Sequence, residues 1–215
     1  MSMDQAFKEG IYLIDKPAGR SSFSVVAEVR RKSGIKKVGH AGTLDPFATG
    51  LLIVLVGKDY TKKAGEFLKM DKSYEAEIDL SAFSSTGDPE GSLEQIECTA
   101  PNKDNVIHTL SKFVGQSMQK PHQFSAVKIC GQPAYKLARA GKEVNLKEKQ
   151  IKIYRIQLIE YNFPILKIET DVSSGTYIRV LAEDIGKALG CGGYLKSLRR
   201  TKIDKYLIDE AIKLD

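Results

Sequence analysis

GHAGTLDPFATGLLIVLV, residues 39–56, joins a glycine-rich loop that carries one carboxylate, Asp45, to an uninterrupted apolar run. The run at 51–56 is short, branched and wholly apolar, which is typical of a strand covered on both faces. Gly42 and Gly50 permit the backbone of the loop to approach a ligand closely. The stretch therefore predicts a buried strand, preceded by a loop that carries the single acid Asp45.

Asp45 has two interpretations from the residues alone. In an ordinary Asp-Pro turn a short acid bonds to the backbone, and Pro46 pushes the residue before it toward extended geometry. Alternatively, an acid in a loop that leads into a buried strand could serve as a nucleophile or a base. A role as a metal ligand is poorly supported, since no other carboxylates or histidines cluster nearby in the sequence.

Alternating apolar residues predict further strands. Residues 74–80 and 166–172 alternate as half-buried strands do, and a slip in phase within 151–158 predicts a bulged strand. The polar, turn-rich segment at 84–91 predicts an exposed loop. Because strands outnumber helices and helices do not follow each strand in turn, we expect an α+β fold with a largely antiparallel or mixed sheet. Helical spacing of apolar residues occurs at 23–27, 106–114 and 178–185.

Length, charge and cysteine content narrow the class of protein. A chain of 215 residues suits one sizeable domain, and its net charge of +6 favours a polyanionic partner such as nucleic acid. The first ten residues are mixed and charged, unlike a signal peptide, and the longest apolar run is too short for a membrane-spanning helix. Cys98, Cys130 and Cys191 form neither a CxxC pair nor a metal-ligand cluster, so we expect a reduced, cytoplasmic protein.

Four other residues are candidates for function. His40 fits a histidine in a turn, a proton carrier, or a flat ring that stacks on a base. Arg179 lies in the first turn of a predicted helix, where a cation is unfavourable with the helix dipole. Pairing with a partly buried carboxylate would explain its position. On residue type alone, Lys16 fits a solvated turn and Tyr74 fits a half-buried aromatic.

Taken in order, these stretches resemble the motifs of the bacterial tRNA pseudouridine-55 synthase family, the TruB family. Residues 39–52 are similar to its catalytic motif, G-H-x-G-x-L-D-P-x-A-x-G-x-L, at every specified position. Other segments resemble its lysine-proline motif (14–19), tyrosine motif (71–74), substrate-loop motif (125–128), tyrosine-arginine motif (175–179) and closing Leu-Arg-Arg motif (198–200). The resemblance therefore covers nearly the whole chain.

For the architecture, the resemblance implies a pseudouridine synthase fold with an active-site cleft across the sheet. It implies a single catalytic domain over residues 1–215, with an RNA-binding loop insertion around 116–150. Many members of the family continue into a small C-terminal RNA-binding domain of the PUA type. We expect this chain to be a short form without that domain, which would affect affinity and acceptor-stem contacts more than the chemistry.

For the reaction, the resemblance implies that uracil 55 in the tRNA T loop is detached from its ribose and rejoined through C5. Asp45 is implied to be the nucleophile, by attack on C1′ or on C6 of the ring, or to assist a route through a glycal. Arg179 is implied to keep Asp45 ionised, and Tyr74 to stack on the uracil and act as general base. The family needs neither metal nor organic cofactor, and the expected enzyme is a monomer that binds the T stem-loop of tRNA.

The remaining residues are implied to handle the flipped nucleotide. Folded tRNA hides its target, which must be flipped out of the stack at a cost of about a few kcal/mol. His40 is implied to occupy the vacated space, while Tyr177 and Leu198 line the uracil pocket and Lys16 belongs to the substrate site. Phosphate contacts are expected from basic residues at 30–37, 119–155 and 196–202.

Three alternatives stay open from sequence. A nucleoside hydrolase or glycosidase also breaks a sugar C1′ bond with a carboxylate, but most such enzymes use two paired acids, and here only Asp45 lies in a motif. A non-catalytic RNA-binding or RNA-folding module would need the basic surface and have no strict demand for Asp45. A pseudouridine synthase that acts on another RNA is not separable by sequence.

Overall fold

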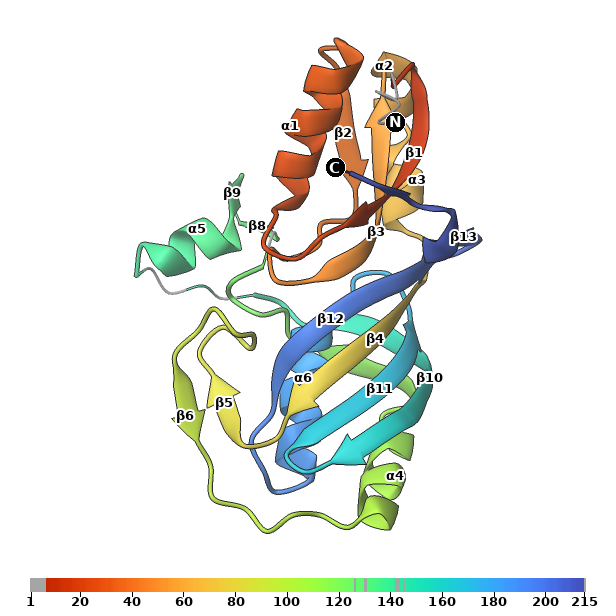
Figure 1. Cartoon of the computed structure of the whole chain (residues 1–215). Helices are drawn as coiled ribbons and strands as arrows, with labels where there is room; N and C mark the ends of the chain where they lie inside the picture. The colour runs from red at the N-terminus through yellow and green to blue at the C-terminus, as the bar shows by residue number, and fades with distance from the viewer. Residues whose placement is uncertain (1–6, 126, 130, 142–143, 145, 215) are drawn as a thin grey trace. The chain divides into compact units, whose positions relative to one another are not determined.

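The computed structural model describes residues 7–125, 127–129, 131–141, 144 and 146–214 (Figure 1). The chain divides into two units, one of Met1–Tyr74 with Arg199–Asp215 and the other of Glu75–Leu198. Two strands, β4 (Lys72–Asp79) and β12 (Tyr194–Ile203), contribute residues to both units.

The first unit is built around the apolar strand predicted from the sequence. This strand, β3 (Thr49–Val56), pairs antiparallel along one edge with β1 (Gly10–Lys16). Its other edge is shared by β2 (Val38–Ala41), which is antiparallel to the second half of β3, and by the end of β12, which is parallel to its first residues. Two short strands complete the unit: β14 (Ile212–Lys213), parallel to β1, and β13 (Tyr206–Leu207), antiparallel to β12.

Both faces of β3 are covered, as its sequence predicted. One face carries Leu52, Val54 and Val56, which share a hydrophobic cluster with three valines of α1 (Ser22–Ser33), namely Val25, Val26 and Val29. The other face carries Leu51, Ile53 and Leu55, which cluster with Phe67 of α3 (Ala64–Leu68) and Ile203 of β12. Helix α1 begins where the Ser21 hydroxyl accepts the Ser24 N–H, and it ends at Gly34 in the left-handed conformation. The short helix α2 (Lys58–Thr61) follows β3, and the 3-10 helix η1 (Ile208–Glu210) precedes β14.

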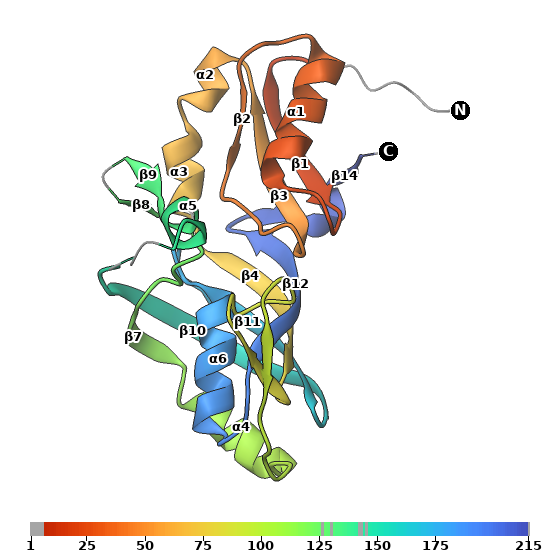
Figure 2. The ribbon, with the colours of Figure 1, turned by 90° about the vertical axis from the view of Figure 1, so that its left-hand side faces the viewer.

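The second unit contains the strand order β12-β4-β11-β10-β7. The long strand β10 (Lys149–Asn162) is antiparallel to both β11 (Ile165–Val172) and β7 (Gly115–Gln119). Its register against β11 shifts twice, between Ile153 and Arg155 and between Leu158 and Glu160, which confirms the predicted bulge. Helices α4 (Lys103–Ser111) and α6 (Ile178–Ala188) lie on one face of these strands (Figure 2). The presence of parallel and antiparallel pairs together with helices confirms the α+β class and the mixed sheet.

Smaller elements border this sheet. The hairpin of β5 (Ala82–Ser84) and β6 (Leu93–Gln95) follows β4. The segment at 116–150, predicted as an RNA-binding insertion, contains β8 (Lys128–Ile129), β9 (Gln132–Pro133) and α5 (Ala134–Arg139). Residues 126, 130, 142, 143 and 145 lie outside the described residues, so the substrate-loop motif is described only in part. RNA binding by this segment stays a prediction.

The cysteines correct one expectation. Cys98, in the connection after β6, and Cys191, in the turn after α6, form a disulfide bond across 93 residues of sequence, with Cα atoms 5.3 Å apart. The expectation of reduced thiols is therefore wrong for this pair, because only the fold brings the two residues together. Cys130 lies outside the described residues. In the described part of the chain, every helix is too short or too polar to span a membrane.

Candidate active site

Asp45 lies half-buried in the loop between β2 and β3, and the residues on both sides of it are fixed. Leu44 is buried, and the Ser22 hydroxyl both accepts its N–H (2.9 Å) and donates to its carbonyl (3.0 Å). The carbonyl of Pro46 accepts the N–H of Gly19 at 2.9 Å. The carbonyl of Asp45 itself accepts the N–H of Ala48, which closes a turn. The Asp-Pro turn therefore exists, and it holds the acid at a defined place.

Lys16 ties a second segment to this loop. Its side chain is fully buried, and its ammonium group donates to the carbonyls of Pro17 (2.9 Å), Arg20 (2.6 Å) and Pro46 (3.2 Å). Burial lowers the pKa of Lys16 to about 8, while the negative charge of Asp45 acts in the opposite direction. The interpretation of Lys16 as a solvated turn residue is wrong. With three donors engaged on main-chain carbonyls, Lys16 supports the loop instead of offering a hydrogen bond to a substrate.

Arg200 joins the two ends of the same loop. Its side chain is 1% exposed, and its guanidinium donates through Nε to the carbonyl of Leu51 (2.7 Å) and through Nη2 to the carbonyl of Gly42 (2.9 Å). Gly50 has a φ of 101°, and a Cβ there would lie 2.3 Å from the Arg200 carbonyl oxygen. Only glycine lets the two backbones approach so closely. The expectation that basic residues at 196–202 contact phosphates is therefore wrong for Arg200.

His40 and Tyr74 also belong to the first unit. His40 lies half-buried on β2, and its buried Nδ1 has no hydrogen-bond partner among the described residues. Burial and the positive charge of Arg200 lower the pKa of His40, which favours the neutral ring. Tyr74 is 7% exposed on β4. Two residues before it, Lys72 donates to the carbonyls of Leu68 and Met70, and burial lowers its pKa to about 8.

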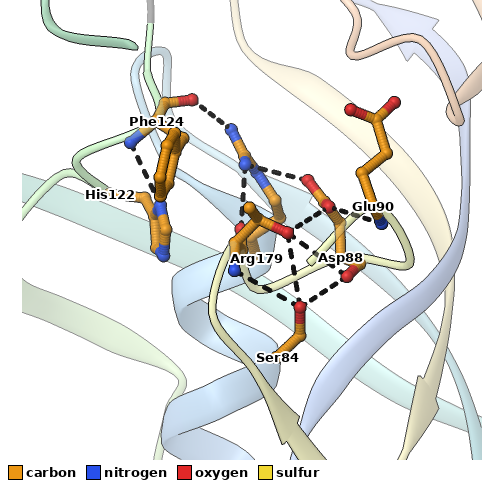
Figure 3. A network of polar contacts seen from close by, with 7 residues as sticks. Ser84, Asp88, Glu90, His122, Phe124 and Arg179 are labelled. Carbon is orange, nitrogen blue, oxygen red and sulfur yellow. Dashed lines mark hydrogen bonds and ion pairs between the residues drawn. The ribbon is translucent and has the colours of Figure 1, made fainter. Parts of the chain in front are cut away.

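In the second unit, Arg179 has the carboxylate partner that its position in the helix suggested. Its side chain is 6% exposed, and Nη1 forms an ion pair with Asp88 at 2.9 Å and donates to the Thr86 carbonyl at 2.9 Å. Nη2 donates to the carbonyl of Phe124, also at 2.9 Å (Figure 3). Three anchors from two loops therefore hold one guanidinium at the start of α6.

Asp88 is the residue that sequence reasoning missed. It is 4% exposed, so the prediction of an exposed loop over 84–91 is wrong at this point. One carboxylate oxygen pairs with Arg179, and the other accepts from the Thr86 hydroxyl (2.5 Å) and the Glu90 N–H (3.1 Å). The Ser84 hydroxyl donates to the Asp88 carbonyl at 2.6 Å (Figure 3). The sequence signal was Arg179 itself, whose position in the first turn of a helix suggested a carboxylate partner without identifying Asp88.

The other two predicted residues of this unit lie near the same helix and on β12. Tyr177 precedes α6, where the side-chain amide of Gln119 accepts its N–H (2.8 Å) and donates to its carbonyl (3.1 Å). Leu198 is 7% exposed on β12. The predicted site residues thus divide between the units: Lys16, His40, Asp45 and Tyr74 in the first, and Tyr177, Arg179 and Leu198 in the second. The pairing of Asp45 with Arg179 and the cleft across the sheet stay predictions.

Over the described part of the chain, no group of three or more histidine, cysteine, aspartate or glutamate side chains is placed to hold a metal ion.

Comparisons with known proteins identify the family of the chain. Residues 30–178 match the N-terminal domain of the TruB family pseudouridylate synthases, and residues 179–215 match the C-terminal domain of tRNA pseudouridylate synthase B. The tRNA pseudouridine synthase B of Protochlamydia amoebophila is 41% identical over 212 residues, which are 99% of this chain and 80% of the relative. That of Desulfotalea psychrophila is 43% identical over 215 residues, covering 97% of this chain and 87% of the relative.

A solved structure is similar over the whole fold. One chain of a Cbf5-Nop10-Gar1 complex matches with a TM-score of 0.75 and 30% identity, covering 95% of this chain and 52% of that chain. The present chain therefore spans about half the length of that relative. The two domain matches together run from residue 30 to residue 215, and both relatives are more than 40% identical along nearly the whole chain. These findings indicate the same family. The chain belongs to the TruB family of pseudouridylate synthases, and it is an isomerase.

Proposed function

We propose that this protein converts uridine 55 in the T loop of tRNA to pseudouridine, with Asp45 as the nucleophile. The relatives named tRNA pseudouridine synthase B support tRNA as the substrate. In this reaction the bond between N1 and C1′ breaks and a bond between C5 and C1′ forms. The proton on C5 is lost and N1 gains one, so the atoms balance without a cofactor.

The observation that carries the proposal is the way the Asp45 loop is held. Ser22 fixes Leu44 through both its N–H and its carbonyl, Lys16 and Gly19 fix the carbonyl of Pro46, and Arg200 joins the ends of the loop. A structural turn does not require so many side chains to immobilise one half-buried acid. A nucleophile does, because a reacting group must be held close to its productive position.

The charges around the loop suit an ionised Asp45. Lys16 and Arg200 are buried cations that donate through Nζ, Nε and Nη2 to uncharged main-chain carbonyls, so these bonds leave their positive charge in place. A nearby cation lowers the pKa of a carboxyl group and keeps it in the nucleophilic form. We propose that Arg179, held by Asp88, pairs with Asp45 and adds its positive charge to those of Lys16 and Arg200.

The roles of the remaining residues follow from their burial and chemistry. The neutral ring of His40 can stack in the space that the flipped nucleotide vacates, because removing a neutral ring from water costs less than removing a cation. Tyr74 would stack on the uracil and remove the C5 proton, while Tyr177 and Leu198 would line the pocket and exclude water. Contacts between the basic surface and the phosphates would supply affinity without sequence information.

The decisive experiment compares Asp45→Asn with Asp59→Asn, whose side chain is exposed on α2 of the same unit. Both variants and the unchanged protein are given a full tRNA transcript, and pseudouridine is mapped by carbodiimide modification. Asp45→Asn should bind the transcript and form no pseudouridine, while Asp59→Asn should behave like the unchanged protein. Turnover by Asp45→Asn would refute the nucleophile.

The unchanged protein separates the alternatives in the same assay. Release of free uracil would indicate a hydrolase, binding without any product would indicate a non-catalytic module, and pseudouridine elsewhere than the T loop would indicate another RNA site. For His40→Ala, we expect a larger loss of rate on folded tRNA than on an unstructured T-loop fragment. Equal losses on both substrates would contradict the gap-filling role.

A further inference from the structure

His122 contacts the Arg179 network without taking part in the ion pair (Figure 3). Its Nδ1 accepts the N–H of Phe124 at 3.2 Å, and the two rings stack with centroids 5.7 Å apart and planes 26° apart. A Cβ added to Gly87 would lie 3.8 Å from Cδ2 of His122 and 3.3 Å from Cβ of Arg179. The imidazole therefore packs between its own loop and the loop that carries Asp88.

Phe124 connects this histidine to the arginine through one residue of backbone. Its N–H is held by Nδ1 of His122, and its carbonyl accepts Nη2 of Arg179 at 2.9 Å. Both contacts are made by the backbone of Phe124. Loss of the hydrogen bond to its N–H would therefore also displace its carbonyl, which accepts from Arg179. The Phe124 carbonyl thus adds an anchor from outside the loop between β5 and β6, which supplies the Thr86 carbonyl and the Asp88 carboxylate.

We infer that His122, in its neutral form, is a positioning residue that holds Arg179 through Phe124, and that protonation of Nδ1 releases this anchor. An imidazole nitrogen accepts a hydrogen bond only while it carries no proton, because both nitrogens of the cation are donors. Protonated His122 would therefore repel the Phe124 N–H as well as the guanidinium behind it. The inference rests on the proposed role of Arg179 in the reaction.

The charged groups around His122 favour the neutral form. Burial and the positive charge of Arg179 lower the pKa of His122. The negative charges of Glu183, which lies on α6 with Arg179, and of Asp88, in the facing loop, act in the opposite direction. Because the folded-state pKa is the lower one, the support is complete above pH 6.5, the ordinary pKa of histidine. It is lost as the pH falls through the folded-state pKa.

The test uses two variants of His122 and one control. In His122→Asn the side-chain oxygen can accept the Phe124 N–H but cannot titrate, whereas His122→Ala removes the acceptor. The control is His108→Ala, since His108 is exposed on α4 of the same unit. Single-turnover rates are measured from about pH 5 to about pH 8, where a histidine changes charge.

The inference makes a separate prediction for each protein. The rate of the unchanged protein and of His108→Ala should fall at acidic pH, and His122→Asn should lose this acidic step while keeping its rate at the alkaline end. His122→Ala should be slower by about fivefold even at the alkaline end, the effect of one hydrogen bond. The inference is overturned if His122→Asn keeps the same step, or if His122→Ala is as fast as the control.

An NMR titration gives a readout that does not depend on activity. The amide proton of Phe124 should shift with the same midpoint as the imidazole of His122, and the side-chain signals of Arg179 should follow. If the amide proton does not follow His122, the inference fails even where the enzyme is active. If it follows while no pseudouridine forms, the proposed function fails and the coupling stands.

Discussion

Replacing Arg200 with methionine tests whether the hydrogen bonds from its guanidinium hold the loop that carries Asp45 in place. Methionine has a similar length and fills the same buried space, but it donates no hydrogen bond. The carbonyls of Gly42 and Leu51, at 2.9 and 2.7 Å from the guanidinium, would each lose a donor. The two ends of the loop would then no longer be joined by a side chain.

The size of the effect follows from these two contacts. A buried carbonyl left without its donor costs about 1–3 kcal/mol, so two cost about 2–6 kcal/mol. Removing a buried cation returns part of this, since its desolvation no longer opposes folding. We therefore expect the free energy of unfolding to fall by about 2–4 kcal/mol. A loosened Asp45 should also slow turnover by about 10- to 100-fold at a temperature where the variant is folded.

The neighbouring residue provides a matched control. Arg199 lies on the same strand and pairs with Asp15 at 2.9 and 3.1 Å, but its side chain is 39% exposed. Exposed ion pairs contribute about 0–1 kcal/mol, so Arg199→Met should change stability little. Urea unfolding followed by circular dichroism gives both values, with pseudouridine formation measured in parallel. Equal losses of stability in the two variants, or full activity of Arg200→Met, would refute the reasoning.

Three further predictions follow from other contacts. Asp88→Asn leaves the buried guanidinium of α6 without its carboxylate, and urea unfolding should show a loss of about 3–5 kcal/mol; an unchanged midpoint would mean that the ion pair contributes nothing. Gly50→Ala places a Cβ 2.3 Å from the Arg200 carbonyl oxygen. The purified variant should therefore unfold at a lower temperature and lose turnover, and wild-type values for both would contradict the close approach. Lys16 and Lys72 have pKa values of about 8 in the folded protein. Since the unfolded chain then binds more protons, stability should rise from about pH 8 to about pH 10.4, and Lys16→Met should remove roughly half of that rise.

Much of the fold was predictable because the signals are local. The apolar run of β3, the alternation of β4 and β11 and the slip in β10 each depend on residues close together in sequence, and the structure confirms all of them. The suggestion of a carboxylate partner for Arg179 was equally local, because it came from a cation in the first turn of a predicted helix. Membership of the TruB family followed from motifs that stand in order along the chain.

The supports of the site were not predictable in this way. Lys16 and Arg200 belong to residue types that usually lie in solvent, and their burial depends on carbonyls that the fold brings around them. Asp88 sits in a polar segment with the composition of an exposed loop, 91 residues from its partner Arg179. These residues make contacts with segments far away in the sequence. Residue type and local spacing do not predict such contacts.

The bond between Cys98 and Cys191 encloses a large part of the second unit in a covalent ring. Closing a ring of this length limits the unfolded chain and stabilises the folded state by roughly 4–5 kcal/mol in the chain-entropy model. The whole segment at 116–150 lies inside that ring, together with β10, β11 and α6. A protease that cuts once within this segment would therefore leave two fragments that stay covalently joined under denaturing conditions and separate there only after a reductant is added.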